Sequence, residues 1–161
     1  MLSLCRKLTS PKDPMPALIR PVTAADRAGW DALYAGYAAV YGVTQTPQMR
    51  HRVWSWLMDP AHPVTGFVAE EGVRLTGMTH CRPFARPLSA TTGGFLDDLF
   101  VAAEARGTGT AQALIAAVRA HGATQGWSVI RWITAEDNAP ARALYDQIAV
   151  KTRWVTYDIP L

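Results

Sequence analysis

The sequence predicts a mixed α/β fold in which helices flank a mixed, mostly antiparallel sheet, with the element order β-α-α-β-β-β-α-β-α-β. Two observations lead to this prediction. From residue 17 onward, short apolar runs typical of strands alternate with runs whose apolar residues follow helical spacing. The 161 residues are 49% hydrophobic and include six Trp, which is enough for one core. We therefore expect one domain over residues 17–161, preceded by a flexible extension over residues 1–16.

The first half of this domain is predicted to hold a strand, two helices and a hairpin. Residues 18–22 are typical of an edge strand, and Thr23 and Asp26 have the spacing of a capping box that starts a helix. The inward positions of this helix are Trp30, Leu33, Tyr34 and Tyr37. Thr46 and Pro47 start a second helix. Its inward positions are Met49, Val53, Trp54 and Leu57. Residues 64–70 and 74–82 form a predicted hairpin, and residues 83–94 a polar connection.

The second half continues the alternation of strands and helices. Residues 95–101 are typical of a buried strand, which leads into a glycine-rich turn and a helix. The apolar positions of this helix are Ala111, Leu114, Ile115 and Val118. Gly126 is expected to end the helix, and residues 128–134 to form another buried strand. Asn138 lies at the start of a helix over residues 141–148, and residues 152–159 are predicted to close the chain as a strand.

Composition and charge argue against several classes of protein. The net charge of +3 comes from 16 basic residues scattered singly along the chain, so no nucleic-acid partner is expected. Cys5 and Cys81 are too few for a disulfide framework and do not stand at metal-ligand spacing with His, so no metal is expected. Arg6 and Lys7 follow the apolar start instead of preceding it, and no apolar run approaches the ~18 residues that span a bilayer. We expect a cytoplasmic protein that does not bind a membrane.

The most informative segment is the loop after the buried strand, which reads Arg106-Gly107-Thr108-Gly109-Thr110-Ala111. A glycine loop at a helix N-terminus gathers unpaired N–H groups at the positive end of the helix dipole, so it can hold a phosphate. A dinucleotide-binding fingerprint would need a third Gly where Gln112 stands, and the Gly-Lys-Ser/Thr of a Walker-type loop is absent. Taken alone, the loop could equally be a tight turn that lets strand and helix pack.

Two linked motifs carry a family resemblance. Arg106-x-x-Gly109-x-Ala111 resembles the acetyl-CoA pyrophosphate motif of the GCN5-related N-acetyltransferases (GNAT), and Asn138-x-x-Ala141-Arg142-x-Leu144-Tyr145 resembles the next helix of that family. The two motifs stand in the family's order and separation, and the resemblance covers residues 17–161. The resemblance is close to the bacterial and fungal branch of the family, whose members acetylate polyamines, small amines, amino acids or protein lysines. The resemblance implies the GNAT acyl-CoA N-acyltransferase fold and acetyl-CoA as co-substrate, without a metal or a covalent enzyme intermediate.

Asp97 and Asp98 are the candidates for handling the proton of the amine. Deprotonating an ammonium group with a pKa near 10 costs about 4 kcal/mol at pH 7, so a base or a water chain is needed. The resemblance places the family's acidic base at Asp97, where the shorter Asp replaces the commoner Glu and favours relay through a water. Strand alternation puts Asp97 on the face of Phe95, Leu99 and Val101, and Asp98 on the opposite face. Either carboxylate could instead cap a loop or pair with an Arg.

Tyr145 occupies the position of the general acid in the resemblance. The leaving CoA thiolate has a pKa comparable to the ~8.5 of a cysteine, and a phenol near 10 can donate a proton to it at little cost. The place of Tyr145 between Leu144 and Ile148 on an amphipathic helix would also suit a core tyrosine.

The resemblance also implies the contacts with acetyl-CoA. The backbone of Leu99, Phe100 and Val101 is expected to pair with the pantetheine arm as an added strand. The pyrophosphate is expected on the amides of the glycine loop: Arg106, Gly107, Thr108, Gly109, Thr110 and Ala111. Asn138 and Arg142 are further cofactor contacts, with Asn138 at the pantetheine or cysteamine end. A helix N-cap role explains Asn138 almost equally well.

The acceptor pocket is expected among the first two helices, the hairpin and the final strand. The candidates to line it are Tyr41, Trp54, Trp56 and His80, because aromatic walls attract amines through cation–π contacts. Each could instead belong to the core, and His80 could extend a proton relay. After Ile148 the chain has residues for little more than one strand where the family usually has two. A homodimer partner could therefore supply one wall of the pocket.

The sequence thus favours an N-acetyltransferase that acts on a primary amine, either a small amine, a polyamine or an amino acid. Two alternatives stay open at this point. One is a protein lysine or N-terminal acetyltransferase, and the other is a non-catalytic module that binds acetyl-CoA.

Overall fold

The chain divides into two compact units in a computed structural model that describes residues 17–161. The first unit ends at Arg131, and the second runs from Trp132 to Leu161. The expected flexible extension over residues 1–16 lies outside the described residues.

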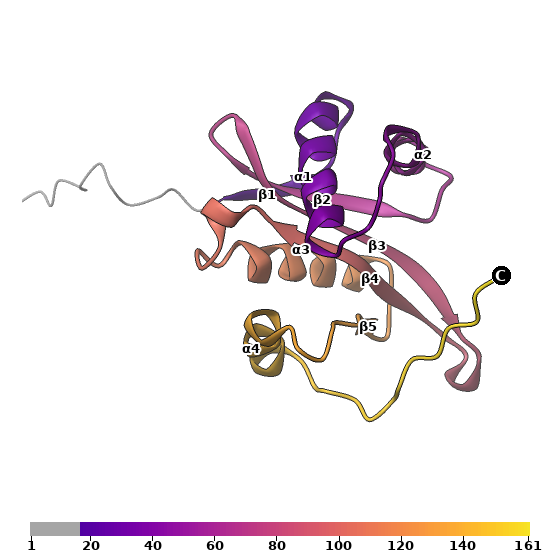
Figure 1. The fold of residues 1–161 in the computed structure, drawn as a ribbon. Coiled ribbons are helices and arrows are strands. Elements are labelled where there is room, and N and C mark those ends of the chain that lie inside the picture. Colours follow the sequence, from indigo (N-terminus) through magenta and orange to yellow (C-terminus); the bar gives the residue numbers. More distant parts are fainter. Residues whose placement is uncertain (1–16) are drawn as a thin grey trace, which may run out of the picture. The chain divides into compact units, whose positions relative to one another are not determined.

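A five-stranded sheet is the centre of the first unit, with its strands in the order β1-β2-β3-β4-β5 (Figure 1). The strands are β1 (Leu18–Pro21), β2 (Thr65–Glu71), β3 (Arg74–Arg86), β4 (Thr91–Val101) and β5 (Ile130–Arg131). All neighbours pair antiparallel except β4 and β5, which are parallel. The predicted mixed α/β architecture with a mostly antiparallel sheet is therefore confirmed.

Helices cover both faces of this sheet. Helices α1 (Arg27–Val40) and α2 (Pro47–Met58) lie on one face, and α3 (Thr110–Thr124) lies on the other (Figure 1). On the α1 face, Trp30 and Leu33 pack against Val68 of β2 and Met78 of β3. The buried residues of α3 include Leu114, Ile115 and Val118, three of the predicted apolar positions. Full burial of each large apolar side chain contributes about 1.5–3 kcal/mol, so these two layers supply most of the core. The prediction for Met49 is wrong, because this side chain is exposed.

Gly126 terminates helix α3, as predicted, and the end of the helix forms a Schellman motif. Gly126 has φ +68°, a left-handed conformation that glycine adopts without strain. The N–H of Trp127 donates to the carbonyl of Gly122 at 2.9 Å, and that of Gly126 donates to Ala123 at 3.2 Å. Trp127 then folds over the sheet at Gly94, where a Cβ atom would lie only 2.0 Å from the indole.

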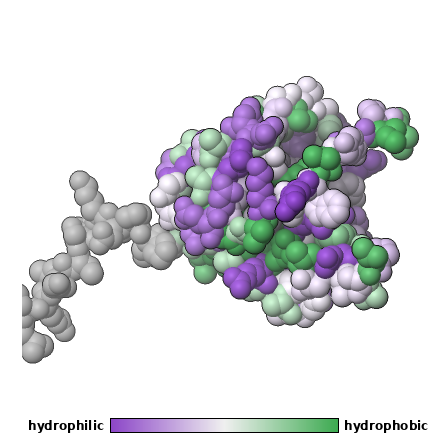
Figure 2. Space-filling view, turned by 90° about the horizontal axis from the view of Figure 1, so that it is seen from below, coloured by the Kyte–Doolittle hydropathy of each residue, from purple (hydrophilic) through white to green (hydrophobic). Residues whose placement is uncertain are grey.

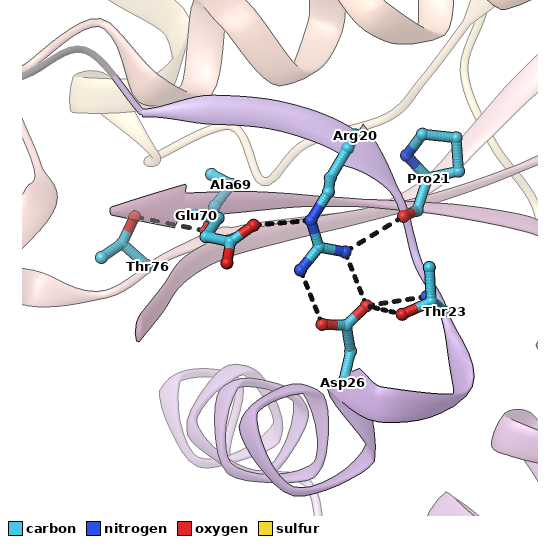
Figure 3. A network of polar contacts seen from close by, with 7 residues as sticks. All are labelled: Arg20, Pro21, Thr23, Asp26, Ala69, Glu70 and Thr76. Carbon is cyan, nitrogen blue, oxygen red and sulfur yellow. Dashed lines mark hydrogen bonds and ion pairs between the residues drawn. The ribbon is translucent and has the colours of Figure 1, made fainter. Parts of the chain in front are cut away.

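An ion-pair network ties β1 and β2 to the start of α1 (Figure 3). Arg20 donates to both carboxylate oxygens of Asp26, at 2.7 and 2.8 Å, and through Nε to Glu70 at 2.6 Å. Asp26 also accepts from the backbone N–H of Thr23 at 2.7 Å, as the predicted cap requires. The Arg20 hydrogen bonds, acting against the effect of burial, lower the pKa of Asp26 to about 2.

Three predicted strand boundaries are wrong. Residues 83–94 are not a polar connection, because β3 and β4 continue as a long hairpin and turn through the short 3-10 helix η2 (Pro87–Ser89). Pro83 fits there because β3 pairs with β2 only as far as Cys81, and an edge position tolerates proline. The strand predicted over residues 128–134 has only the two residues of β5, and residues 152–159 form no strand.

The second unit contains helix α4 (Ala139–Ile148) and a terminal segment without regular secondary structure. An alternating apolar pattern forms a strand only beside a partner strand, and none of residues 132–161 lies in a strand. The apolar side chains of this segment are exposed: Val150, Trp154, Val155, Tyr157, Ile159 and Leu161. Figure 2 shows hydrophobic residues at the surface among hydrophilic ones. Among the described residues, no helix is both long and apolar enough to cross a membrane.

Candidate functional site

The two adjacent carboxylates lie at a β-bulge in β4. His80 of β3 pairs with Asp98, whereas the next residue, Cys81, pairs with Leu96. Asp97 is therefore one extra residue on β4 without a partner of its own. A bulge of this kind interrupts the strict alternation of side chains along a strand, and bulges are frequent next to active sites.

The bulge brings both carboxylates to one face of the sheet. His80 and Arg82 are two residues apart in β3, so their side chains share a face. Nδ1 of His80 lies 2.8 Å from Oδ2 of Asp98, and Nε of Arg82 lies 3.1 Å from Oδ1 of Asp97. Phe95 pairs with Arg82 and shares this face too. The prediction of opposite faces for Asp97 and Asp98 is wrong, because it assumes an unbroken strand.

A chain of hydrogen bonds runs from Trp30 of α1 through His80 of β3 to Asp98 of β4. The indole Nε1–H of Trp30 donates to Nε2 of His80 at 2.9 Å, and the exposed fractions of the two residues are only 1% and 2%. An indole nitrogen can only donate, so Nε2 of His80 must be the acceptor. The neutral His80 ring therefore carries its proton on Nδ1 and donates it to Asp98.

A row of tyrosines on α1 leads from this chain toward the surface. Tyr34 meets the His80 ring edge-on at 5.1 Å, Tyr37 stacks on Tyr34, and the half-exposed Tyr41 packs against Tyr37 at 5.0 Å. Burial raises the pKa of Tyr34 and of Tyr37, and the charge of Asp98 raises both further. Sequence reasoning assigned Tyr34 and Tyr37 to the core. The spacing of the three tyrosines by three and four residues was the available signal for a shared helix face.

Asp97 differs from Asp98 in its surroundings. Its side chain is 29% exposed. Burial raises the pKa of Asp97, the charge of Arg82 opposes this, and the charge of Asp98 adds to it. A carboxyl group with a raised pKa is better suited to accept a proton near neutral pH than an ordinary aspartate.

The two tryptophan candidates on α2 lie in different surroundings. Trp54 packs against Trp30 with ring centroids 5.1 Å apart, at the margin of the core. Trp56 is stacked on His62 instead, and its side chain is partly exposed. Of these candidates, His80 contacts Asp98 directly. Tyr41 is connected to His80 only through the rings of Tyr37 and Tyr34. Trp54 is connected to His80 only through Trp30.

The glycine loop has the geometry of an anion cradle. Gly107 and Gly109 have φ of +77° and +88°, and a Cβ atom on either would meet nothing within 4 Å. Thr108 Oγ1 donates to the carbonyl of Ala105 and shares a hydrogen bond with Thr110 Oγ1. No side chain of the described residues caps the N-terminus of α3, so its first N–H groups are open to a ligand.

The edge of β4 beyond the bulge is open on one side. β5 pairs with β4 only at Gly94 and Phe95. Within the described chain, Leu96 and residues 98–101 of β4 pair with β3 alone. Arg106 donates through Nε to the Val101 carbonyl at 3.1 Å, and its guanidinium lies over the Phe100 ring. This edge, which includes Leu99, Phe100 and Val101, can accept an extended amide-bearing ligand as an added strand.

The remaining predicted residues lie in the second unit. Asn138 caps α4, because its Oδ1 accepts from the N–H of Ala141 at 3.4 Å, which confirms the N-cap reading. Arg142 donates to the backbone carbonyl of Glu136. The Tyr145 ring packs against Trp132, with centroids 5.4 Å apart. Residues 17–161 contain no group of three or more His, Cys, Asp or Glu side chains that could hold a metal ion.

Comparison with known proteins gives consistent matches. The model of the acetyltransferase (GNAT) family matches residues 30–149. The D-amino-acid N-acetyltransferase HPA3 of Saccharomyces cerevisiae is 24% identical over 143 residues, which are 87% of this chain and 88% of that protein. The crystal structure of ribosomal-protein-alanine N-acetyltransferase from Brucella melitensis has a TM-score of 0.76 at 22% identity and covers 91% of this chain and 100% of its own. The aminoglycoside N-acetyltransferase AAC(6')-Iy in complex with CoA has a TM-score of 0.81 at 17% identity, covering 94% and 99%.

Proposed function

The chain belongs to the acetyltransferase (GNAT) family and is an acyltransferase, and from that premise we propose that it moves the acetyl group of acetyl-CoA to the primary amine of a small molecule. The observation that carries the proposal is the β4 bulge. It places Asp97 and Asp98 on one face, beside a row of tyrosines and next to a strand edge that is free to bind an extended ligand.

The residues of the first unit suit the binding of acetyl-CoA. The amides at the start of α3 are aimed at its pyrophosphate, and the glycines at 107 and 109 leave room for a close approach. The pantetheine arm, which contains amide groups, pairs with the open β4 edge at Leu99, Phe100 and Val101. Arg106 adds a positive charge beside this path.

Starting from the ammonium ion, the amine nitrogen gives up two protons, one before the attack and one after it, and the sulfur takes up one. The amine loses a proton to Asp97 through a water, and its nitrogen then attacks the thioester carbonyl carbon. A C–N bond forms, the C–S bond breaks, and the electron pair leaves on sulfur. The Tyr145 hydroxyl gives a proton to the CoA thiolate, and the proton that the nitrogen loses after the attack restores the Tyr145 hydroxyl. The role of Tyr145 rests on the family resemblance, and that of Asp97 on its raised pKa and its place in the bulge.

The names of related proteins support a small amine as the acceptor. HPA3 is named for D-amino acids, and other similar structures are named for aminoglycosides. The Brucella protein is named for an alanine of a ribosomal protein, which keeps a protein N-terminus as the alternative acceptor. The homodimer and the cytoplasmic location stay predictions.

Thiol release tests the proposal directly. The full chain with acetyl-CoA is offered amino acids of both hands, polyamines, aminoglycosides and peptides with an N-terminal alanine, and free CoA is followed with a thiol-reactive dye. Turnover with a small amine is the expected result. Turnover with peptides alone would favour the protein acceptor. A module that only binds would show thermal stabilisation by acetyl-CoA without thiol release, and this outcome would overturn the proposal.

A further inference from the structure

We infer that Trp30 and His80 form a positioning pair, which holds the Asp98 carboxylate in place to bind the ammonium group of the acceptor. The inference rests on the proposed function and names the chemical form in which the acceptor is recognised, a primary ammonium ion. It also separates the roles of the two carboxylates, with Asp98 binding the cation and Asp97 handling the proton.

The first step is the fixed tautomer of His80. Its Nε2 is used by the Trp30 indole, so its single proton lies on Nδ1 and points to Asp98. The ring cannot easily turn. Trp30 and Tyr34 both contact it, at centroid distances of 5.8 and 5.1 Å, and its exposed fraction is 2%. Tight packing of this kind gives the Nδ1–H donor a constant direction.

The second step is that Asp98 needs a support of this kind. Asp98 follows the extra residue of a bulge, and bulges re-aim side chains and loosen the local ladder. A fixed donor on the neighbouring strand compensates for this by holding one carboxylate oxygen at 2.8 Å. Trp30 and Tyr34 of α1 contact the His80 ring in turn, Trp30 through a hydrogen bond and Tyr34 edge-on. Asp98 is therefore held by β3 directly and by α1 through His80.

The third step concerns charge. Among the ion pairs of the described residues, Asp97 is paired with the charged guanidinium of Arg82. The partner of Asp98 is the imidazole of His80, which is neutral in the tautomer described above. Donors without a net charge orient the Asp98 carboxylate but leave its negative charge uncompensated. Its side chain is 20% exposed, so a ligand can reach it. A largely buried carboxylate whose hydrogen-bond donor is uncharged favours the binding of a cation.

The fourth step is the shape of the cation. An ammonium group has three N–H donors, one of which can bond to Asp98, and aromatic rings such as those of the tyrosine row attract a positive charge. Tyr41, which is half exposed, lies at the outer end of the row. The site therefore selects an amine that is charged when it binds.

A pair of substitutions at His80 tests the inference. In Asn the amide nitrogen is bonded to Cγ, as Nδ1 is in His, so His80→Asn keeps a donor toward Asp98. In Gln the amide is one atom further out, at the position of Nε2, so His80→Gln has no donor at the position of Nδ1 toward Asp98. We expect His80→Gln to raise KM for the amine about ten- to a hundredfold, the effect of losing one hydrogen bond to a charged group, with a smaller change in kcat. His80→Asn should raise KM less than about threefold. Equal effects of the two variants would overturn the inference.

A measurement on the unmodified full chain does not depend on turnover or on the folding of variants. Nitrogen NMR of the His80 ring reads the tautomer, and the Nδ1–H form is expected. n-Butylamine should shift the ring signals of His80, whereas its neutral isostere n-butanol and an equal concentration of sodium chloride should not. An Nε2–H tautomer, or equal shifts with amine and alcohol, would overturn the inference. Failure of every amine to be acetylated, with these signals as expected, would overturn the proposed function alone.

Discussion

Replacing Asp26 by Asn is expected to destabilise the protein by about 2 kcal/mol at pH 7. The carboxylate is 7% exposed and accepts two hydrogen bonds from Arg20, which lower its pKa from 3.8 to about 2. At about 1.36 kcal/mol for each pKa unit, this difference corresponds to about 2.4 kcal/mol. The folded state has the lower pKa, so the stabilisation is complete above pH 3.8 and is lost as the pH falls through about 2.

Urea unfolding followed by tryptophan fluorescence measures this effect. The free energies of unfolding of the wild type and Asp26→Asn should differ by about 2 kcal/mol at pH 7, and the gap should close as the pH is lowered toward 2. Asp31→Asn is the matched control. Asp31 is 31% exposed, and its Oδ1 lies 3.3 Å from Arg27 and 3.0 Å from Arg50, so water screens these ion pairs more and its loss should cost less than that of Asp26. A gap below about 0.5 kcal/mol for Asp26→Asn, or one that does not narrow in acid, would refute the reasoning.

Three further substitutions test the catalytic assignments and the packing. Tyr145→Phe should lower kcat by roughly 10²–10⁴ while acetyl-CoA binding, measured by calorimetry, is retained; a near-normal kcat would remove Tyr145 from the mechanism. Burial raises the pKa of Asp97, so the wild-type rate should fall in acid as Asp97 takes up a proton. Asp97→Asn should lack this fall at the acid end of its pH–rate profile. If the rate of Asp97→Asn falls in acid as the wild-type rate does, a group other than Asp97 takes up the proton. Gly94→Ala would place a Cβ atom 2.0 Å from Trp127, so we expect a loss of about 1–3 kcal/mol in thermal unfolding, and wild-type stability would contradict the packing.

The helices and the first hairpin could be predicted because their signals are local. The spacing of Trp30 and Leu33 marks the buried face of α1, and Asn138 and Gly126 mark helix ends through their own caps. Residues 83–94 were misread because Pro83 is unfavourable in a central strand, and only the pairing shows that β3 has become an edge there. The last predicted strand failed because an alternating pattern does not form a strand without a partner.

The sequence by itself determined the fold class, the glycine loop over residues 106–111 and the family, because helical spacing, turn residues and short motifs act over a few neighbouring residues. The tertiary structure alone decided where the two carboxylates lie. The bulge depends on the register between β3 and β4, and it sets Asp97 and Asp98 on one face where alternation predicts two. The Trp30–His80 hydrogen bond joins residues 50 positions apart, and that between His80 and Asp98 spans 18. Contacts over such separations follow from packing, which no periodicity in the sequence encodes.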